Sequence, residues 1–387
     1  MLQRFKILFT FIGIACTIQA QVLRNGADQI EKLIPLLKDK RIALVVNHTS
    51  IVGETQTHLL DTLLALRINV KKIFAPEHGF RGNANAGETV KNGRDIKSGL
   101  PILSLYGKNK KPTKNQLLDI DAVIFDIQDV GARFYTYIST MHYVMEACAE
   151  NNKQIFITDR PNPCDYVDGP IRETGKESFV GMHPIPILHG CTIGELALMI
   201  NGEGWLKNSI KCDLTVIPRE GWIHGQAYSL PVKPSPNLPN NQAISFYASL
   251  CPFEGTDISV GRGTYTPFQI IGSPSIKDRT YSFIPQPLEG FDKNPLHKGT
   301  ICYGHNLQNT ESPQGFSLKY ILLYYSLYKE QNKAHLFFTR PSWFDLLMGT
   351  EQVRLDIING KDETAIRKSW QEGLMKYKKM RTKYLLY

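Results

Sequence analysis

Carboxylate and imidazole side chains follow short apolar runs at several points in this chain. Glu77 and His78 come directly after the run at 70–75, and Asp126 and Asp129 follow the run at 122–125. Asp159 follows the run at 154–158. Glycoside hydrolysis needs a protonated carboxylic acid beside the leaving oxygen and usually a second carboxylate. These residue types therefore suit the cleavage of a glycosidic bond.

Glu77 is our candidate for the general acid. Phe74 and Phe80 lie near it in the sequence, and this apolar setting could keep an acid protonated. Neither Glu77 nor His78 has an obvious structural role between a proline and a glycine. Asp129, which follows another apolar run, is our candidate for the second catalytic group.

The same segments carry side chains suited to binding a sugar acid. Tyr135 and Tyr137 offer ring-sized surfaces that are apolar on the face and polar at the edge. Arg81, Arg133 and Arg160 offer planar guanidinium groups that can bind a substrate carboxylate through two hydrogen bonds. We expect one of these arginines to pair with such a carboxylate, with Arg133 the first choice because it lies among the aromatic residues.

Other readings of these residues stay open. Glu77, His78 and Asp129 could instead be metal ligands around an activated water. Asp159 and Arg160 could form an internal ion pair, and Asp126 could cap the turn that follows it. The chain has no G-x-G-x-x-G after its first apolar run, no G-x-x-x-x-G-K-[ST] and no G-x-S-x-G. We therefore expect no nucleotide cofactor and no serine nucleophile elbow.

Parallel strands would bring these clusters together. The runs at 42–46, 70–75, 101–105, 122–125, 154–158 and 213–217 read as strands, and a loop leads from Asp159 to the run at 185–188. Helices are expected at 26–37, 57–66, 114–119, 136–151 and from 192. The carboxyl ends of parallel strands share one edge of a sheet, where ligands bind. Beyond a proline-rich stretch near 235 we expect irregular structure to about 317, then helices at 318–330, 343–349, 353–359 and 366–377.

The N-terminus reads as a secretory signal peptide over residues 1–20, with Arg4 and Lys6 before a short apolar run. We expect a periplasmic or secreted protein, with lipid anchoring at Cys16 as the minor alternative. Removal of the signal lowers the formal charge from +9 to +7. Export makes nucleic acid an unexpected partner. The other six cysteines show no metal-ligand spacing, so we expect buried thiols. Their positions in the sequence do not indicate which of them could form a disulfide.

Several motifs resemble a known family. They are Pro76-Glu-His-Gly79, Asp126 to Tyr137, Asp159-Arg-Pro-Asn-Pro163, His189 to Glu195, Pro234 to Pro239, Phe253 to Thr256, Ser259 to Thr264 and Arg381 to Tyr387. Together they are similar to the exo-β-N-acetylmuramidases, a glycoside hydrolase family long catalogued as a domain of unknown function. The resemblance covers nearly the whole chain after the signal.

The resemblance implies a Rossmann-like catalytic domain (21–235), a smaller α+β C-terminal domain (236–387) and an active cleft between them. It implies release of N-acetylmuramic acid from the non-reducing ends of peptidoglycan fragments, without a cofactor or a metal, with Glu77 as the acid. A non-catalytic protein that binds cell-wall sugars in the same cleft stays open. Residues carried over as substrate-binding are Asn47, Arg81, Gln128, Arg133, Tyr135, Tyr137, Asp159, Arg160, Asn162, His189, Asn237, Glu254 and Arg262.

Overall fold

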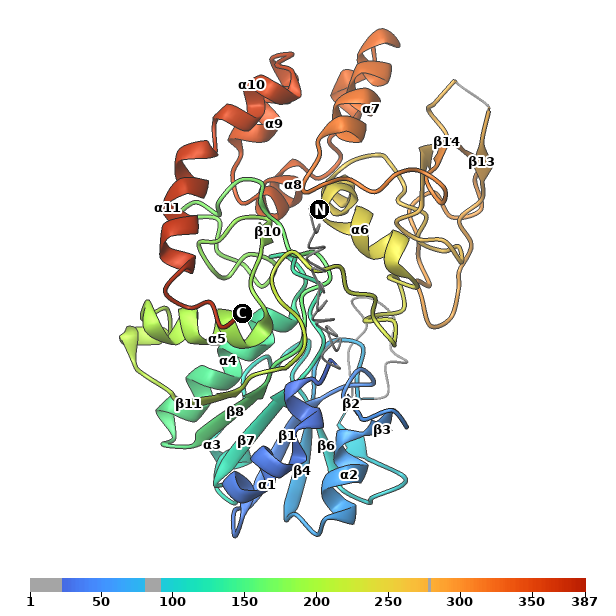
Figure 1. Cartoon of the computed structure of the whole chain (residues 1–387). Coiled ribbons are helices and arrows are strands. Elements are labelled where there is room, and N and C mark those ends of the chain that lie inside the picture. Colours follow the sequence, from blue (N-terminus) through green and yellow to red (C-terminus); the bar gives the residue numbers. More distant parts are fainter. Residues whose placement is uncertain (1–22, 81–91, 278–279) are drawn as a thin grey trace, which may run out of the picture.

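A parallel sheet forms the N-terminal half of the protein (Figure 1). The structure, a computed structural model, describes residues 23–80, 92–277 and 280–387. Within these residues the main sheet has seven strands in the order β11-β8-β7-β1-β4-β6-β5, parallel except for β5. The strands are β1 (Ile42–Val46), β4 (Val70–Ala75), β5 (Gly93–Arg94), β6 (Pro101–Ser104), β7 (Ala122–Asp126), β8 (Gln154–Thr158) and β11 (Asp213–Ile217).

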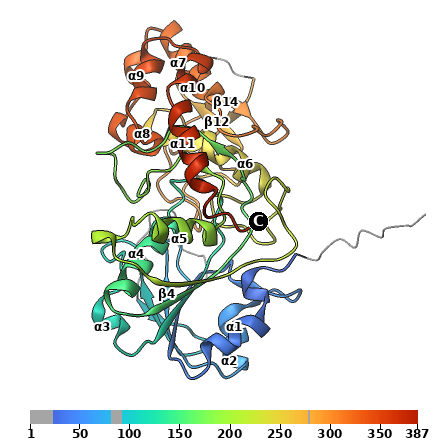
Figure 2. The ribbon, with the colours of Figure 1, turned by 60° about the vertical axis from the view of Figure 1, so that its left-hand side comes forward.

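Helices cover both faces of this sheet (Figure 2). Ala43 and Val45 of β1 belong to one buried core, whereas Ile42 and Leu44 belong to another. Side chains of a strand alternate between faces, so a strand buried on both sides needs apolar residues throughout, which explains the uninterrupted runs. The first core includes residues of α4 (Tyr137–Glu150) and α5 (Ile193–Gly202), and the second includes residues of α1 (Ile30–Leu37) and α2 (Leu59–Ala65).

The C-terminal half is smaller and mixed. An antiparallel sheet has the order β12 (Ile270–Ser273), β14 (Cys302–Asn306) and β13 (Ser282–Phe283). One apolar core runs through both halves, and α11 returns to the N-terminal half close to α5 (Figure 2). The helices are α6 (Asn241–Leu250), α7 (Lys319–Glu330), α8 (Pro341–Met348), α9 (Gln352–Ile358), α10 (Glu363–Lys368) and α11 (Gln371–Arg381). The α/β class predicted from the sequence is confirmed.

Two elements differ from the prediction. The short strand β10 (Leu188–His189) lies after the loop that follows β8, and it pairs antiparallel with β9 (Val167–Asp168) outside the main sheet. Helix α6 lies in a region expected to be irregular, and its N-cap Asn240 accepts a hydrogen bond from the Ala243 amide at 3.0 Å. The helix expected at 366–377 is two helices, α10 and α11. The remaining short elements are α3 (Lys114–Leu117), β2 (Ile51–Val52) and β3 (Thr57–His58).

The six cysteines outside the signal are free thiols, and all of them are buried. Among the described residues, none of the helices is both long and apolar enough to cross a membrane. The predicted signal peptide, including Cys16, lies outside the described residues.

Candidate active site

A cavity of about 880 Å³ lies between the two halves of the chain. The N-terminal half contributes loops that follow the carboxyl ends of β4, β6 and β7, as the sheet topology predicts. The C-terminal half contributes α6, the segment after it and α8. This volume is in the range of small-molecule binding sites. Its polar lining includes Glu77, Tyr106, Lys110, Thr136, Glu254, Ser259, Arg262, Asp292, Asn294 and Arg340.

Glu77 lies in a tight turn directly after β4. His78 and Gly79 both have positive φ values, +66° and +76°, and this left-handed pair turns the chain away from the sheet. Thr136 Oγ1 donates a hydrogen bond of 2.6 Å to Glu77 Oε2. Tyr106 lies nearby, and burial, reinforced by the charge of Glu77, raises the pKa of Tyr106. The hydroxyl group of Thr136 therefore orients the carboxyl group at the cavity wall.

A small recess of about 60 Å³ adjoins the main cavity at Glu77. The two spaces are adjacent, because both are lined by Glu77, Phe134, Thr136, Tyr247 and Arg262. The rest of the recess wall includes four residues that the sequence predicted for the site: His78, Tyr135, Tyr137 and Asn237.

The two tyrosines form one wall of the recess. Their rings meet edge to face with centroids 4.8 Å apart. The hydroxyl groups of Tyr135 and Tyr137 both donate to the Pro234 carbonyl, at 2.9 and 3.4 Å. This shared acceptor links the loop after β7 to the proline-rich segment, and it leaves the rings as an apolar surface.

Arg262 and Glu254 form an ion pair on the C-terminal side of the main cavity. Arg262 donates from Nε and Nη2 to Glu254 Oε1 at 3.1 and 2.6 Å. Burial lowers the pKa of Arg262, but the carboxylate of Glu254 outweighs it and raises the pKa above its ordinary value. The sequence motifs placed both residues at the site, and the structure places both at the cavity.

Arg133, the predicted partner of a substrate carboxylate, lies elsewhere. Its side chain is fully buried, and its guanidinium group donates to the carbonyls of Pro170, Ile185 and Leu347 at 2.8–2.9 Å. Burial lowers the pKa of Arg133 to about 9. The placement of Arg133 at the substrate is thus contradicted, because the group has no exposed surface and joins the two halves of the chain. Arg81 lies outside the described residues.

Arg160 also has an internal partner. It binds Asp126 through two hydrogen bonds, Nε to Oδ1 at 2.7 Å and Nη2 to Oδ2 at 2.8 Å. Both side chains are buried, and Thr158 donates to the same carboxylate at 2.8 Å. The alternative that Arg160 forms an internal ion pair is therefore correct in kind, but its partner is Asp126 rather than Asp159. Arg160 is not positioned to bind a substrate.

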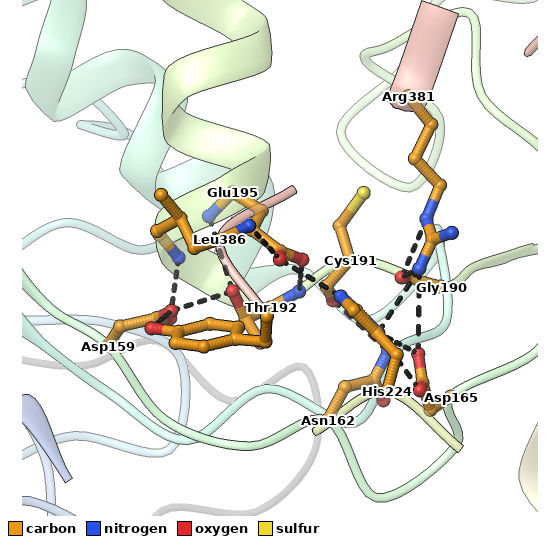
Figure 3. Close-up of polar contacts among 12 residues, drawn as sticks. Asp159, Asn162, Asp165, Gly190, Cys191, Thr192, Glu195, His224, Arg381 and Leu386 are labelled. Atoms are coloured by element: carbon orange, nitrogen blue, oxygen red, sulfur yellow. Dashed lines mark hydrogen bonds and ion pairs between the residues drawn. The ribbon is translucent and has the colours of Figure 1, made fainter. Parts of the chain in front are cut away.

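Asp159 anchors the C-terminal segment (Figure 3). Its carboxylate accepts hydrogen bonds from Thr192 Oγ1, the Gly194 amide and Tyr387 Oη, each at 2.7 Å. Burial raises the pKa of Asp159 to about 6. Nearby, Asn162 donates to the Cys191 carbonyl at 3.1 Å. These contacts contradict the predicted substrate-binding role of Asp159 and Asn162, because both polar groups are used inside the fold.

Asp129 and His189 lie together beneath the cavity wall. His189 Nε2 is 3.4 Å from Asp129 Oδ2, and the Gly131 amide donates to the same oxygen at 2.7 Å. Both side chains are buried and line neither space. Burial raises the pKa of Tyr137, and the charges of Glu77 and Asp129 both add to this shift, so the two carboxylates lie near the same ring. The structure does not bring Asp129 into the cavity with Glu77.

Asn47 and Gln128 support the strand-end loops. Asn47 Oδ1 accepts from the Thr49 amide and hydroxyl at 2.8 and 2.6 Å. Gln128 Nε2 donates to the carbonyls of Asp129 and Pro161 at 2.9 and 2.8 Å. Both side chains are buried and absent from the walls of the two spaces, so their predicted contact with a substrate stays a prediction.

Several residues of the cavity were missed from the sequence. Tyr106 and Lys110 follow the end of β6, so the strand-end rule could have found them. Thr136 lies between the two tyrosines that were predicted. Arg340 and Trp343, at the start of α8, follow no pattern that links them to the sheet edge. Within the described part of the chain, no group of three or more His, Cys, Asp or Glu side chains is placed to hold a metal ion.

Glu77 is thus a carboxyl group in an aromatic cavity at the edge of a parallel sheet, a position suited to glycoside hydrolysis. Comparison with known proteins agrees. Residues 42–242 match the family model for the N-terminal domain of the exo-β-N-acetylmuramidase NamZ, and residues 245–387 match the model for its C-terminal domain. The chain therefore belongs to the NamZ family and is a glycosidase.

Individual relatives cover almost the whole chain. The peptidoglycan β-N-acetylmuramidase NamZ of Bacillus subtilis is 39% identical, over 92% of this chain and 90% of the relative. A solved structure of a DUF1343 family protein from Bacteroides fragilis is 46% identical, with a TM-score of 0.86 over 95% of this chain and 99% of the other. A second Bacteroides fragilis structure of the same family is 29% identical, with a TM-score of 0.80 over 94% and 99%. The resemblance seen in the sequence motifs is confirmed.

Proposed function

We propose that this enzyme releases N-acetylmuramic acid from the non-reducing ends of peptidoglycan fragments, with Glu77 as the general acid. The position of Glu77 carries the proposal. Among the described residues it is the one carboxylate that lines both the main cavity and the recess. The family description, exo-β-N-acetylmuramidase, and the named activity of the Bacillus subtilis relative support the substrate class.

The surroundings of Glu77 suit proton donation to a leaving group. A general acid must hold one orientation toward the glycosidic oxygen. The hydrogen bond from Thr136 Oγ1 provides that orientation. Aromatic side chains, including Phe134 and Tyr247, provide ring-sized surfaces for the sugar next to the acid.

The lactyl group distinguishes muramic acid from N-acetylglucosamine, and its carboxylate needs a cationic partner when it is removed from water. Three cations line the described part of the main cavity, and Arg262 is already paired with Glu254. Lys110 lies 4.3 Å from the centroid of the Phe179 ring, and Arg340 lies 5.2 Å from that of the Trp343 ring. We assign the lactyl carboxylate to Lys110 or Arg340 in place of Arg133 and Arg160.

The predicted signal peptide supports action outside the cytoplasm, where peptidoglycan is found. We retain a periplasmic or secreted location as part of the proposal, with lipidation at Cys16 as the alternative. Metabolic labelling with a radioactive fatty acid detects lipidation at Cys16. N-terminal sequencing of the processed protein identifies the residue at which the signal peptide is cleaved.

Substitution Glu77→Gln tests the acid. The variant should stay folded and lose at least about a hundredfold in kcat on a muramic acid disaccharide, because the amide cannot donate the required proton. The loss should be smaller on a nitrophenyl glycoside, whose leaving group needs less protonation. Glu372→Gln, at an exposed carboxylate on α11, is the matched control and should leave kcat unchanged. Normal turnover of the disaccharide by folded Glu77→Gln contradicts the assignment.

Chelation separates this mechanism from the metal-dependent alternative. Dialysis against EDTA should leave activity unchanged if Glu77 acts as a proton donor. Activity that is lost on chelation and restored by one divalent ion would instead identify Glu77 as a ligand or a metal-assisted base. A protein that binds muramic acid saccharides but cleaves none of them would support the non-catalytic alternative.

A further inference from the structure

The recess beside Glu77 has the size of a sugar substituent rather than of a sugar ring. Its volume of about 60 Å³ gives room for about four water molecules. An acetamido group has four non-hydrogen atoms. The main cavity is large enough for the sugar rings themselves, so the recess can take one substituent of a ring that lies against Glu77.

Asn237 brings an unsatisfied acceptor to the recess. Its Nδ2 donates to the Phe291 carbonyl at 3.0 Å, which fixes the orientation of the amide. Its Oδ1 is buried and has no hydrogen-bond partner in the described part of the chain. A buried acceptor without a partner is costly, so a native protein that keeps one at a cavity wall calls for an explanation. A ligand N–H group would satisfy it.

Arg262 brings an unsatisfied donor to the same space. Its Nε and Nη2 are bound to Glu254, whereas Nη1 is buried and lacks a partner among the described residues. The ion pair holds the guanidinium plane in place. The residues that line the recess therefore include one unsatisfied acceptor and one unsatisfied donor, which is the complement of an amide.

Apolar rings complete the wall. Tyr247 and Phe268 meet edge to face with centroids 5.0 Å apart, and both line the recess together with Leu238. The aromatic faces of Tyr135 and Tyr137 lie there as well. This surface suits the methyl group of an acetamide, because the transfer of a methyl group from water to an apolar surface is favourable and needs no polar partner.

From these observations we infer that the recess is the subsite for the 2-acetamido group of the sugar cleaved at Glu77, with Asn237 and Arg262 as its specificity-determining residues. The inference rests on the proposed function and follows from the stereochemistry of the sugar. The acetamido nitrogen and the glycosidic oxygen are carried by neighbouring carbons. A pocket for the first must therefore adjoin the acid that protonates the second, and the recess adjoins Glu77. Asn237 Oδ1 accepts from the amide N–H, and Arg262 Nη1 donates to the acetyl oxygen.

The test compares matched substrates in matched variants. Nitrophenyl glycosides of N-acetylmuramic acid and of its analogue with a 2-hydroxyl group differ only in the group assigned to the recess. The wild-type enzyme should prefer the acetamido substrate in kcat/KM by about a hundredfold, and Asn237→Ala should narrow this ratio at least about tenfold. A 2-butanamido analogue, which is longer than the recess, should be cleaved poorly by the wild-type enzyme and relatively better by Asn237→Ala.

Asn241→Ala is the control, because Asn241 lies four positions away at an exposed site and binds Ser229. It should keep the wild-type ratio. Arg262→Lys is the second variant, since lysine keeps the charge but not the planar group, and it should narrow the same ratio. Thermal unfolding establishes that each variant is folded. An unchanged ratio in folded Asn237→Ala and in folded Arg262→Lys overturns the assignment.

Binding separates failure of this inference from failure of the proposed function. Should the enzyme cleave neither glycoside, affinity for free N-acetylmuramic acid and for 3-O-lactylglucose is measured by NMR titration. If Asn237→Ala lowers the affinity for N-acetylmuramic acid but not for 3-O-lactylglucose, the acetamido subsite is supported even though the proposed hydrolytic activity is not. Equal effects on both sugars overturn the subsite.

Discussion

Thr136 Oγ1 donates a hydrogen bond of 2.6 Å to Glu77 Oε2, and Thr136 is also the N-cap residue of α4. The residue that begins a helix thus fixes the carboxyl group at the end of β4. The two segments are far apart in the sequence. Because α4 is packed in the core, Thr136 is held in place and restricts the orientation of Glu77.

Removal of this hydrogen bond should lower turnover without unfolding the enzyme. Thr136→Val should lower kcat about tenfold or more with little change in KM, because Glu77 loses one of the groups that orient it. Thr136→Ser keeps the hydroxyl and should retain most of the activity. Steady-state kinetics with thermal unfolding checks this, and equal kcat values in the two variants would show that Thr136 does not position Glu77.

Substitution of the cavity cations should affect substrate preference. Lys110→Ala or Arg340→Ala should reduce the preference for muramic acid over glucosamine glycosides by at least about tenfold, because a buried carboxylate without its cation is costly. Activity on the glucosamine glycoside should change little. The ratio of kcat/KM values for the two glycosides is the measurement, and selectivity that survives both substitutions would place the carboxylate elsewhere.

Arg133 should matter for stability rather than for selectivity. Arg133→Met removes donors from three buried carbonyls and should lower the free energy of unfolding by about 3 kcal/mol or more. Chemical denaturation measures the loss. At a temperature where the variant is folded, its preference for muramic acid should be that of the wild type, and a selective loss of muramic acid cleavage would restore Arg133 as a substrate ligand.

His224 should make stability depend on pH in the alkaline range. Burial lowers its pKa, but hydrogen bonds to Asp165 and Glu195 outweigh burial and raise the pKa to about 9 (Figure 3). The folded state therefore binds a proton more tightly than the unfolded state. The contribution of protonated His224 to the free energy of unfolding is complete below about pH 6.5 and is lost as the pH rises through about 9.

Thermal unfolding between pH 6.5 and 9.5 tests this contribution. The wild-type Tm should fall by about a few degrees across the range, and His224→Phe should show a lower Tm at pH 6.5 and a flatter profile. His335→Phe, at an exposed site, is a suitable control and should follow the wild type. A profile that is equally steep in His224→Phe would assign the titration to other groups.

The sequence predicted the central sheet because its strands are buried on both faces, and burial on both faces leaves uninterrupted apolar runs. Glu77, Tyr135, Tyr137, Asn237, Glu254 and Arg262 were predicted and do line the cavity or its recess. Helix α6 was missed because the prolines before it obscured an otherwise regular apolar spacing.

The polar residues of the strand-end loops were the main source of error. A short motif shows that Asp126, Arg160, Asp159 and Asn162 lie near the sheet edge, but not whether each side chain faces the cavity or the interior. Pairing decides this, and the partners are distant in the sequence: Asp126 binds Arg160, and Asp159 binds Tyr387. Arg340 carried no signal because a lone cation on a loop is usually only solvated, whereas Lys110 could have been found from its place after the end of β6.

Helix α11 crosses from the C-terminal half to the N-terminal half, where Tyr377 Oη donates to the His189 carbonyl and Tyr384 Oη donates to Glu203, both at 2.7 Å. Residues matched by one family model therefore complete the fold of residues matched by the other. We therefore expect the two segments to unfold together, and neither should be stable when expressed alone. Recombination between relatives should succeed only when the contacts of α11 are exchanged together with the β10 segment that receives them.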